Sequence, residues 1–209
     1  MEGAIVAKYR NAGQTCVCVN RLFVHDQVYE RFVTAFAARV RELRVGNGFA
    51  PDTQIGPLIS EKAVGKVSEL IGDALAKGAR LVEGGQPHSA GPLFFQPTIL
   101  ADVAPGMQLL DEEIFGPVTP VVRFSSDAEV VRLANDTPYG LAAYFYSRDV
   151  GRVWRIAEQL EYGMVGVNTG LISNEVAPFG GVKESGLGRE GSKYGIEDYL
   201  EMKYLCLAV

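Results

Sequence analysis

Apolar positions along the chain follow two alternating patterns, one typical of helices and one typical of strands. A spacing of three to four residues begins at Asp26, which we expect to be an N-cap, and begins again at Ser60. Four segments with this spacing predict helices: 26–43, 60–75, 127–135 and 149–160. Short apolar runs predict strands at 19–24, 81–82, 118–124, 142–146 and 164–168. Strands separated by helices imply an α/β fold, with a mostly parallel sheet and helices on both faces.

Both ends of the chain show incomplete patterns. Residues 4–9 resemble the end of a helix whose start is missing. The last eight residues, MKYLCLAV at 202–209, are apolar almost throughout. A strand buried on both faces reads this way, so we expect this segment to pair with something. It is either an internal strand of the domain's own sheet or a strand at an interface between subunits.

Composition narrows the class of protein. Of the 209 residues, 47% are hydrophobic and 22% are charged, as in a soluble globular domain. A net charge of −5, with scattered basic residues, argues against nucleic acid as a partner. No apolar run approaches the ~20 residues that cross a bilayer, and the first residues lack a signal-peptide pattern. We therefore expect a cytoplasmic protein, and its three cysteines favour thiol chemistry over a disulfide framework.

One cysteine lies in a short polar loop directly before a predicted strand. The segment 11–16 reads NAGQTC and is followed by VNRLFV after Cys18. Open α/β sheets place ligands in loops at strand ends, and backbone N–H groups there can stabilise an oxyanion. Cys16 is therefore a candidate nucleophile, and the alternative is a buried structural cysteine. The other cysteines and the histidines lack zinc-like spacing, so we expect no metal site.

Two further motifs follow. Residues 111–118, DEEIFGPV, place acids and an aromatic before a predicted strand, although a solvated acidic turn would read the same way. Residues 178–191, PFGGVKESGLGREG, contain G-x-G-x-x-G at Gly186, Gly188 and Gly191. No strand precedes this motif and only 18 residues follow it (209 minus 191), too few for a dinucleotide-binding βαβ unit. We expect these glycines to let a long loop turn close to other backbone.

Taken in order, these three motifs resemble those of the aldehyde dehydrogenase superfamily. NAGQTC resembles its cysteine signature, EEIFGPV its second motif and PFGGVKESGLGREG its C-terminal motif, so the resemblance covers nearly the whole chain. CVC, RVGNGF, GLISNEVAPFGG and GREGSKYGIEDYLEMKYLC are similar to segments of succinate-semialdehyde dehydrogenases. The resemblance implies oxidation of an aldehyde by NAD or NADP, and the sequence does not distinguish these two cofactors.

The resemblance also implies roles for particular residues. Cys16 would attack the aldehyde to give a thiohemiacetal and then a thioester. Glu113 would hold the nicotinamide ribose and Phe115 would pack beside the cofactor. Phe179 would line the substrate tunnel. Arg10 and Ser173 would grip the distal carboxylate of succinate semialdehyde, for which a guanidinium is well suited.

One departure from the family pattern is large. The family's dinucleotide-binding domain precedes this region and is absent, and with it go the water-activating glutamate, an oxyanion asparagine and a second substrate arginine. We therefore expect residues 1–209 to be a catalytic domain that is inactive alone. Segment 202–209 would be its oligomerisation strand in a homo-oligomer, either a dimer or a tetramer.

Two rival functions and a redox hypothesis stay open. The chain could be an inert assembly module, or an acyltransferase that passes the acyl group to another thiol. Cys16 and Cys18 could also form a reversible disulfide, because so short a loop gains little closure entropy and is easily reduced. Against this, strand residues two apart have Cα atoms ~6.6 Å apart, near the limit for bridging.

Overall fold

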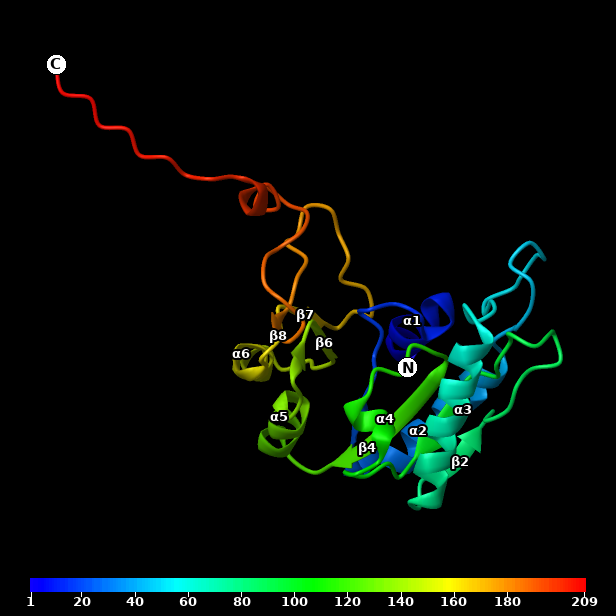
Figure 1. The fold of residues 1–209 in the computed structure, drawn as a ribbon. Helices are drawn as coiled ribbons and strands as arrows, with labels where there is room; N and C mark the ends of the chain where they lie inside the picture. Colours follow the sequence, from blue (N-terminus) through cyan, green and yellow to red (C-terminus); the bar gives the residue numbers. More distant parts are fainter.

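A four-stranded sheet forms the centre of the structure, a computed structural model that describes residues 1–209 (Figure 1). The strand order is β1-β4-β3-β2. Strands β1 (Leu22–His25), β4 (Val118–Phe124) and β3 (Thr98–Ala101) are parallel, and β2 (Arg80–Glu83) is antiparallel to β3. The prediction of a mostly parallel α/β sheet is therefore confirmed.

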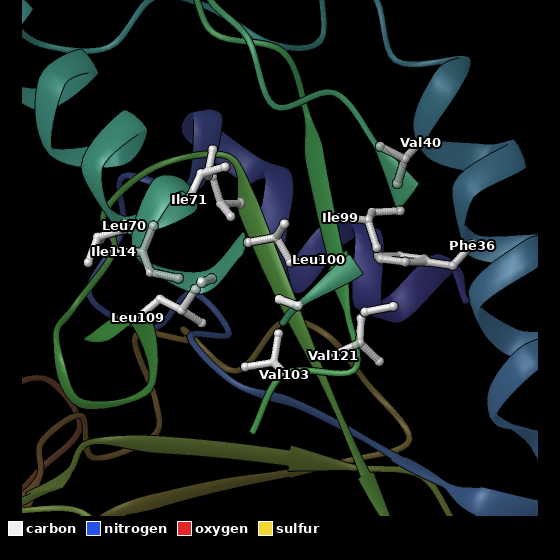
Figure 2. Close-up of a cluster of buried hydrophobic side chains, with 14 of the residues drawn as sticks. Phe36, Val40, Leu70, Ile71, Ile99, Leu100, Val103, Leu109, Ile114 and Val121 are labelled. Atoms are coloured by element: carbon white, nitrogen blue, oxygen red, sulfur yellow. The ribbon is translucent and has the colours of Figure 1, made fainter. Parts of the chain in front are cut away.

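Helices cover this sheet on both faces. Figure 2 shows Phe36 of α2 (Tyr29–Arg41) beside Ile99 and Val121, while Leu70 and Ile71 of α3 (Glu61–Ala76) lie across the sheet. The first five residues of β4 are all buried, which explains why its sequence reads as a continuous apolar run. The core thus fixes where the loops at the strand ends are placed.

A second, smaller group of elements follows in the chain. Strands β6 (Ala142–Phe145) and β7 (Met164–Val167) form a parallel pair, and β5 (Tyr139–Gly140) pairs antiparallel with β8 (Val182–Lys183). The accompanying helices are α5 (Asp127–Asn135) and α6 (Val150–Gln159). Arg21, directly before β1, ties the two groups together, because its guanidinium donates to the Leu133 carbonyl at 3.0 Å and the Ala134 carbonyl at 2.8 Å.

Three of the six α-helices, α3, α5 and α6, begin at a residue whose side chain caps the helix. The side-chain oxygen of Ser60 accepts from the Ala63 N–H at 3.2 Å, as predicted. The prediction that Asp26 caps a helix is wrong. Asp26 instead begins a short 3-10 helix, η2 (Asp26–Val28), and His25 Nδ1 accepts from the Gln27 N–H at 3.3 Å. This extra turn moves the start of α2 to Tyr29.

Other predicted boundaries hold closely. The strand at 118–124 and the helix at 127–135 have the predicted limits. Strand β3 was not predicted, because four residues directly after Pro97 give too short an apolar run to separate from loop. Three short elements complete the chain: α1 (Glu2–Tyr9), α4 (Gln108–Asp111) and η3 (Glu197–Tyr199). No helix has both the length and the apolar character needed to cross a membrane.

The C-terminal tail extends away from the rest of the chain (Figure 1). Residues 202–209 form no strand, so the alternative of an internal strand is wrong. Leu205 is 81% exposed and Leu207 is 78% exposed. An apolar extended segment with unpaired backbone groups is a template for pairing with another chain.

We expect deletion of residues 202–209 to lower the mass of the native assembly, because this segment would supply the pairing strand. Light scattering on the chain with and without the tail measures this mass. An alanine replacement at exposed Phe49, which lies outside the tail, is the matched control for loss of an apolar surface residue. An assembly of unchanged mass after the deletion would contradict the interface role.

Candidate active site

The loop that carries Cys16 has an unusual backbone path. It starts with η1 (Arg10–Gly13), in which Asn11 has φ 52° and Ala12 has φ 56°. Asparagine tolerates this left-handed region, whereas alanine there costs about 1 kcal/mol. The Asn11 side chain donates to the Gln14 carbonyl at 2.9 Å and so closes the loop on itself. Strained backbone that the surroundings hold in place is typical of functional loops.

Gln14 anchors this loop to a neighbouring segment. Its Nε2 donates to the Pro57 carbonyl at 3.2 Å, and its Oε1 accepts from the Ile59 N–H at 2.9 Å. Both ends of the amide are therefore used, which fixes the side chain in one orientation. The glutamine of the NAGQTC motif thus has a structural role, anchoring the loop, which the sequence did not reveal.

Backbone contact brings the first two motifs together. A Cβ on Gly13, whose φ is 76°, would lie 2.1 Å from the Gly116 carbonyl oxygen, so only glycine fits there. Asn20 adds a second link, since its Oδ1 accepts from the Ile114 N–H at 2.9 Å and its Nδ2 donates to the Glu112 carbonyl at 3.0 Å. Asn20 was not singled out from sequence because an asparagine next to a strand gives no distinctive signal.

These loops border a cavity of about 940 Å³. Four of the predicted site residues line it: Cys16, Cys18, Glu113 and Phe115. Phe115 has φ 50° and its side chain is 40% exposed, so its ring borders the open space. A thiol, a carboxylate and an aromatic ring thus line the same cavity, although Glu113 and Cys16 are far apart in the sequence.

The two thiols that line the cavity, those of Cys16 and Cys18, differ in their surroundings. Cys16 is exposed, and its backbone N–H has no acceptor within the chain, so that group is free to bind a ligand oxygen. Cys18 is half-buried, and its Sγ donates to the Arg10 carbonyl at 3.8 Å. All three cysteines are free thiols in the structure.

The remaining predicted residues do not line this cavity. Arg10 is the C-cap of α1, exposed, and its guanidinium takes part in none of the chain's ion pairs. Ser173 is exposed in the loop after β7. Phe179 is half-buried and exchanges two backbone hydrogen bonds with Glu190, at 2.9 and 2.7 Å. The structure therefore brings four of the seven predicted residues to the cavity.

A buried lysine that sequence reasoning missed also lines the cavity. The Lys8 side chain is 1% exposed and makes no hydrogen bond or ion pair. No fully buried polar atom lacks a partner, so the Lys8 ammonium must reach the cavity space. Burial lowers the pKa of Lys8 to about 8, and the nearby Cys18 and Glu113 oppose this shift. A lysine in the last turn of a predicted helix gives no sequence signal of burial.

Lys66 of α3 is a further polar neighbour. Its ammonium donates to the Glu113 carbonyl at 2.5 Å. This contact holds the backbone of the second motif from the side of the helix.

The glycine-rich third motif is mainly a loop, as predicted, but the expectation that no strand precedes its glycines is wrong, because the two-residue strand β8 (Val182–Lys183) lies just before Gly186. Gly186, Gly188 and Gly191 have φ values of 103°, 83° and 65°, which favour glycine. A Cβ on Gly188 would lie 2.4 Å from Asp198 Oδ2. Arg189 donates to the Gly181 carbonyl at 2.8 Å and closes the loop. Positive φ values account for all three glycines, and at Gly188 the Asp198 carboxylate adds a close contact.

Comparison with known proteins identifies the family of this chain. The description "Aldehyde dehydrogenase family" matches residues 1–205. Glutarate-semialdehyde dehydrogenase of Pseudomonas aeruginosa is 63% identical over 207 residues, which are 99% of this chain and 43% of that protein. Succinate-semialdehyde dehydrogenase [NADP(+)] of Escherichia coli is 61% identical over 209 residues, which are 100% of this chain and 43% of that protein.

A solved structure of a relative also matches this chain closely. Succinate-semialdehyde dehydrogenase from Burkholderia pseudomallei superposes with a TM-score of 0.98 at 64% identity, over 100% of this chain and 43% of that chain. The chain belongs to the aldehyde dehydrogenase family. It spans about 43% of the length of these relatives.

Proposed function

We propose that this chain is the catalytic region of an aldehyde dehydrogenase that oxidises succinate semialdehyde to succinate. The observation that carries the proposal is the exposed Cys16 thiol on a cavity wall shared with Glu113 and Phe115. The thiolate of Cys16 adds to the aldehyde carbon, and the free Cys16 N–H donates to the oxygen that becomes negative. Loss of hydride from the resulting thiohemiacetal leaves a thioester, which water converts to the acid.

The cavity wall fits one side of a nicotinamide cofactor. A carboxylate such as Glu113 accepts hydrogen bonds from ribose hydroxyls, and the exposed ring of Phe115 offers a flat apolar surface. NAD or NADP, when bound, supplies the hydride acceptor. The E. coli relative carries NADP(+) in its name. In this chain Glu113 and Phe115 would orient the cofactor, while Cys16 does the covalent chemistry.

The substrate assignment rests on Arg10. Both relatives are named for semialdehydes that end in a carboxylate, glutarate and succinate semialdehyde, which differ by one methylene. A guanidinium without a protein partner, six residues before Cys16 (16 minus 10), is suited to receive that carboxylate. Ser173 and Phe179 would complete the substrate site. A different aldehyde of this acidic class is the alternative.

Labelling of the chain with a small halogenated aldehyde mimic tests the role of Cys16. We expect one label per chain, at Cys16, formed faster than at Cys206, which is also exposed and lies in the tail. Cys206 therefore serves as an internal control for ordinary thiol reactivity. Equal rates at the two thiols would favour the inert assembly module. Release of free acid by the intact enzyme, and not an acyl thiol, would exclude the acyltransferase.

Replacing Arg10 by alanine in the intact enzyme is expected to lower kcat/KM for succinate semialdehyde. The expected loss of transition-state stabilisation is roughly 1.5–3 kcal/mol, the range for a hydrogen bond to a charged group. An uncharged aldehyde of similar length should lose little. Steady-state kinetics with both substrates measures the difference. Arg31→Ala, at an exposed arginine on α2, is the matched control. Equal losses for both substrates would show that Arg10 serves only as a helix end.

We further propose that Cys16 and Cys18 form the reversible disulfide that inactivates the enzyme under oxidation. Because Cys18 Sγ is directed to the Arg10 carbonyl, closure requires the loop to move. We expect Cys18→Ala to retain activity and to lose the inactivation by peroxide that a thiol reductant reverses. Peptide mapping before and after reduction measures the bridge. Parent-like inactivation and rescue in Cys18→Ala would exclude this pair.

A further inference from the structure

The segment between the two cavity cysteines is held by a side chain from a distant strand. Residues 15–19 belong to no helix or strand. Inside the segment, the Cys18 N–H donates to the Thr15 carbonyl at 2.9 Å, and the Val19 N–H donates to the Ala7 carbonyl at 3.0 Å. The Val17 carbonyl takes part in neither of these hydrogen bonds. It accepts instead from the hydroxyl of Tyr144 at 3.0 Å.

The position of the Tyr144 ring is set by the strand next to it. Tyr144 lies on β6, directly opposite Gly166 of β7 in the register of the pair. A Cβ on Gly166 would lie 2.8 Å from Tyr144 Cδ1, so the missing side chain makes room for the ring. The ring also borders the cavity that Cys16 and Cys18 line. The hydroxyl of Tyr144 therefore links the β6–β7 pair to the segment 15–19.

This bond acts on the peptide that joins the two thiols. Val17 is only 3% exposed, so its side chain is fixed in the core while its carbonyl is fixed by Tyr144. Rotation of the Val17 peptide would change the orientation of the residues on either side of it. At present Cys16 lines the cavity and the Cys18 thiol donates to the Arg10 carbonyl. Burial raises the pKa of Tyr144 to about 12, with nearby Arg10 opposing and Cys18 and Cys16 adding to the shift, so the phenol keeps its proton and stays a donor at neutral pH.

We propose that Tyr144 is a positioning residue that fixes the Val17 peptide and thereby aims the Cys16 thiol into the cavity. The proposal rests on the proposed function, in which Cys16 is the reactive thiol. Tyr144 does not take part in bond making. It removes motion of the nucleophile that would otherwise lower the fraction of productive encounters with an aldehyde.

The test replaces one hydroxyl and compares two tyrosines, Tyr144 on β6 and Tyr146 directly after that strand. Tyr144→Phe removes the bond to Val17, whereas Tyr146→Phe, two residues along, removes a hydroxyl that makes no hydrogen bond. In the chain itself, we expect Tyr144→Phe to slow alkylation of Cys16 by iodoacetamide about three- to tenfold, the range of one hydrogen bond. Tyr146→Phe should match the parent. Alkylation of Cys206 reports reagent quality in every sample.

In the intact enzyme, Tyr144→Phe should lower kcat by a similar factor and leave KM unchanged, because a mis-aimed nucleophile affects chemistry more than binding. Gly166→Ala provides a second variant, since its methyl would press on the Tyr144 ring and should act in the same direction. An unchanged or faster Cys16 alkylation in folded Tyr144→Phe would overturn the proposal. Failure of Cys16 to react faster than Cys206 in the parent would instead overturn the proposed function.

Discussion

The 209-residue chain alone is expected to form no NADH or NADPH when mixed with succinate semialdehyde and either cofactor. Glu113 and Phe115 offer only one wall of a cofactor site, and hydride transfer depends on holding both reactants in a near-attack geometry. The chain also offers no acid that we can assign as the base for thioester hydrolysis. Absorbance of the reduced nicotinamide measures turnover, and calorimetry measures cofactor binding.

Two controls make a negative result informative. Labelling of Cys16 in the same preparation shows that the loop is folded and that the thiol is competent. An intact relative, such as the E. coli enzyme, shows that the assay works under the same conditions. Measurable turnover by the pure chain, free of any full-length enzyme, would contradict the prediction.

Lys8→Met is expected to raise the free energy of unfolding at pH 7 by about 3 kcal/mol, since one pKa unit corresponds to about 1.4 kcal/mol. Folding lowers the pKa of Lys8 from 10.5 to about 8, because burial disfavours the ammonium. The unfolded chain therefore binds the proton more tightly. The cost to stability is fully present below pH 8 and disappears as the pH rises through 10.5.

Urea unfolding of the parent and of Lys8→Met between pH 7 and about pH 10.5 measures this effect. The difference between the two proteins cancels the titration of groups that they share. Lys62→Met, at an exposed lysine in the first turn of α3, is the matched control and should change stability by less than about 0.5 kcal/mol. A constant difference across this pH range would mean that Lys8 is not the titrating group.

Lys8 also matters for the cavity, because its buried side chain lines the same space as the thiols and makes no ion pair. A protein keeps an unpaired buried charge only at a cost. If Lys8→Met proves more stable, the lysine is retained for something other than stability. Labelling of Cys16 and Cys18 in that variant would then report whether the positive charge acts on the thiols.

The sequence by itself determined the class of this protein and much of its local structure. Periodicity placed β4 and α5 correctly, since each is a run whose burial leaves a clear pattern. The three motifs together indicated the family, and one of them carries Asn11 and Gly13, residue types that favour the positive φ values found there. Local backbone geometry depends on residues that are close in the sequence, so it can be predicted from a single sequence.

Only the tertiary structure decided which of these residues meet. Cys16 and Glu113 share a cavity because β1 pairs with β4 and Asn20 binds the loop before β4. The burial of Lys8 and the bond from Tyr144 to Val17 join parts of the chain that are close only after folding. Such contacts impose no period or spacing on the sequence, so they could not be read from it. The tail at 202–209 shows the converse, because its apolar pattern predicts a strand, yet it joins none of the chain's own sheets.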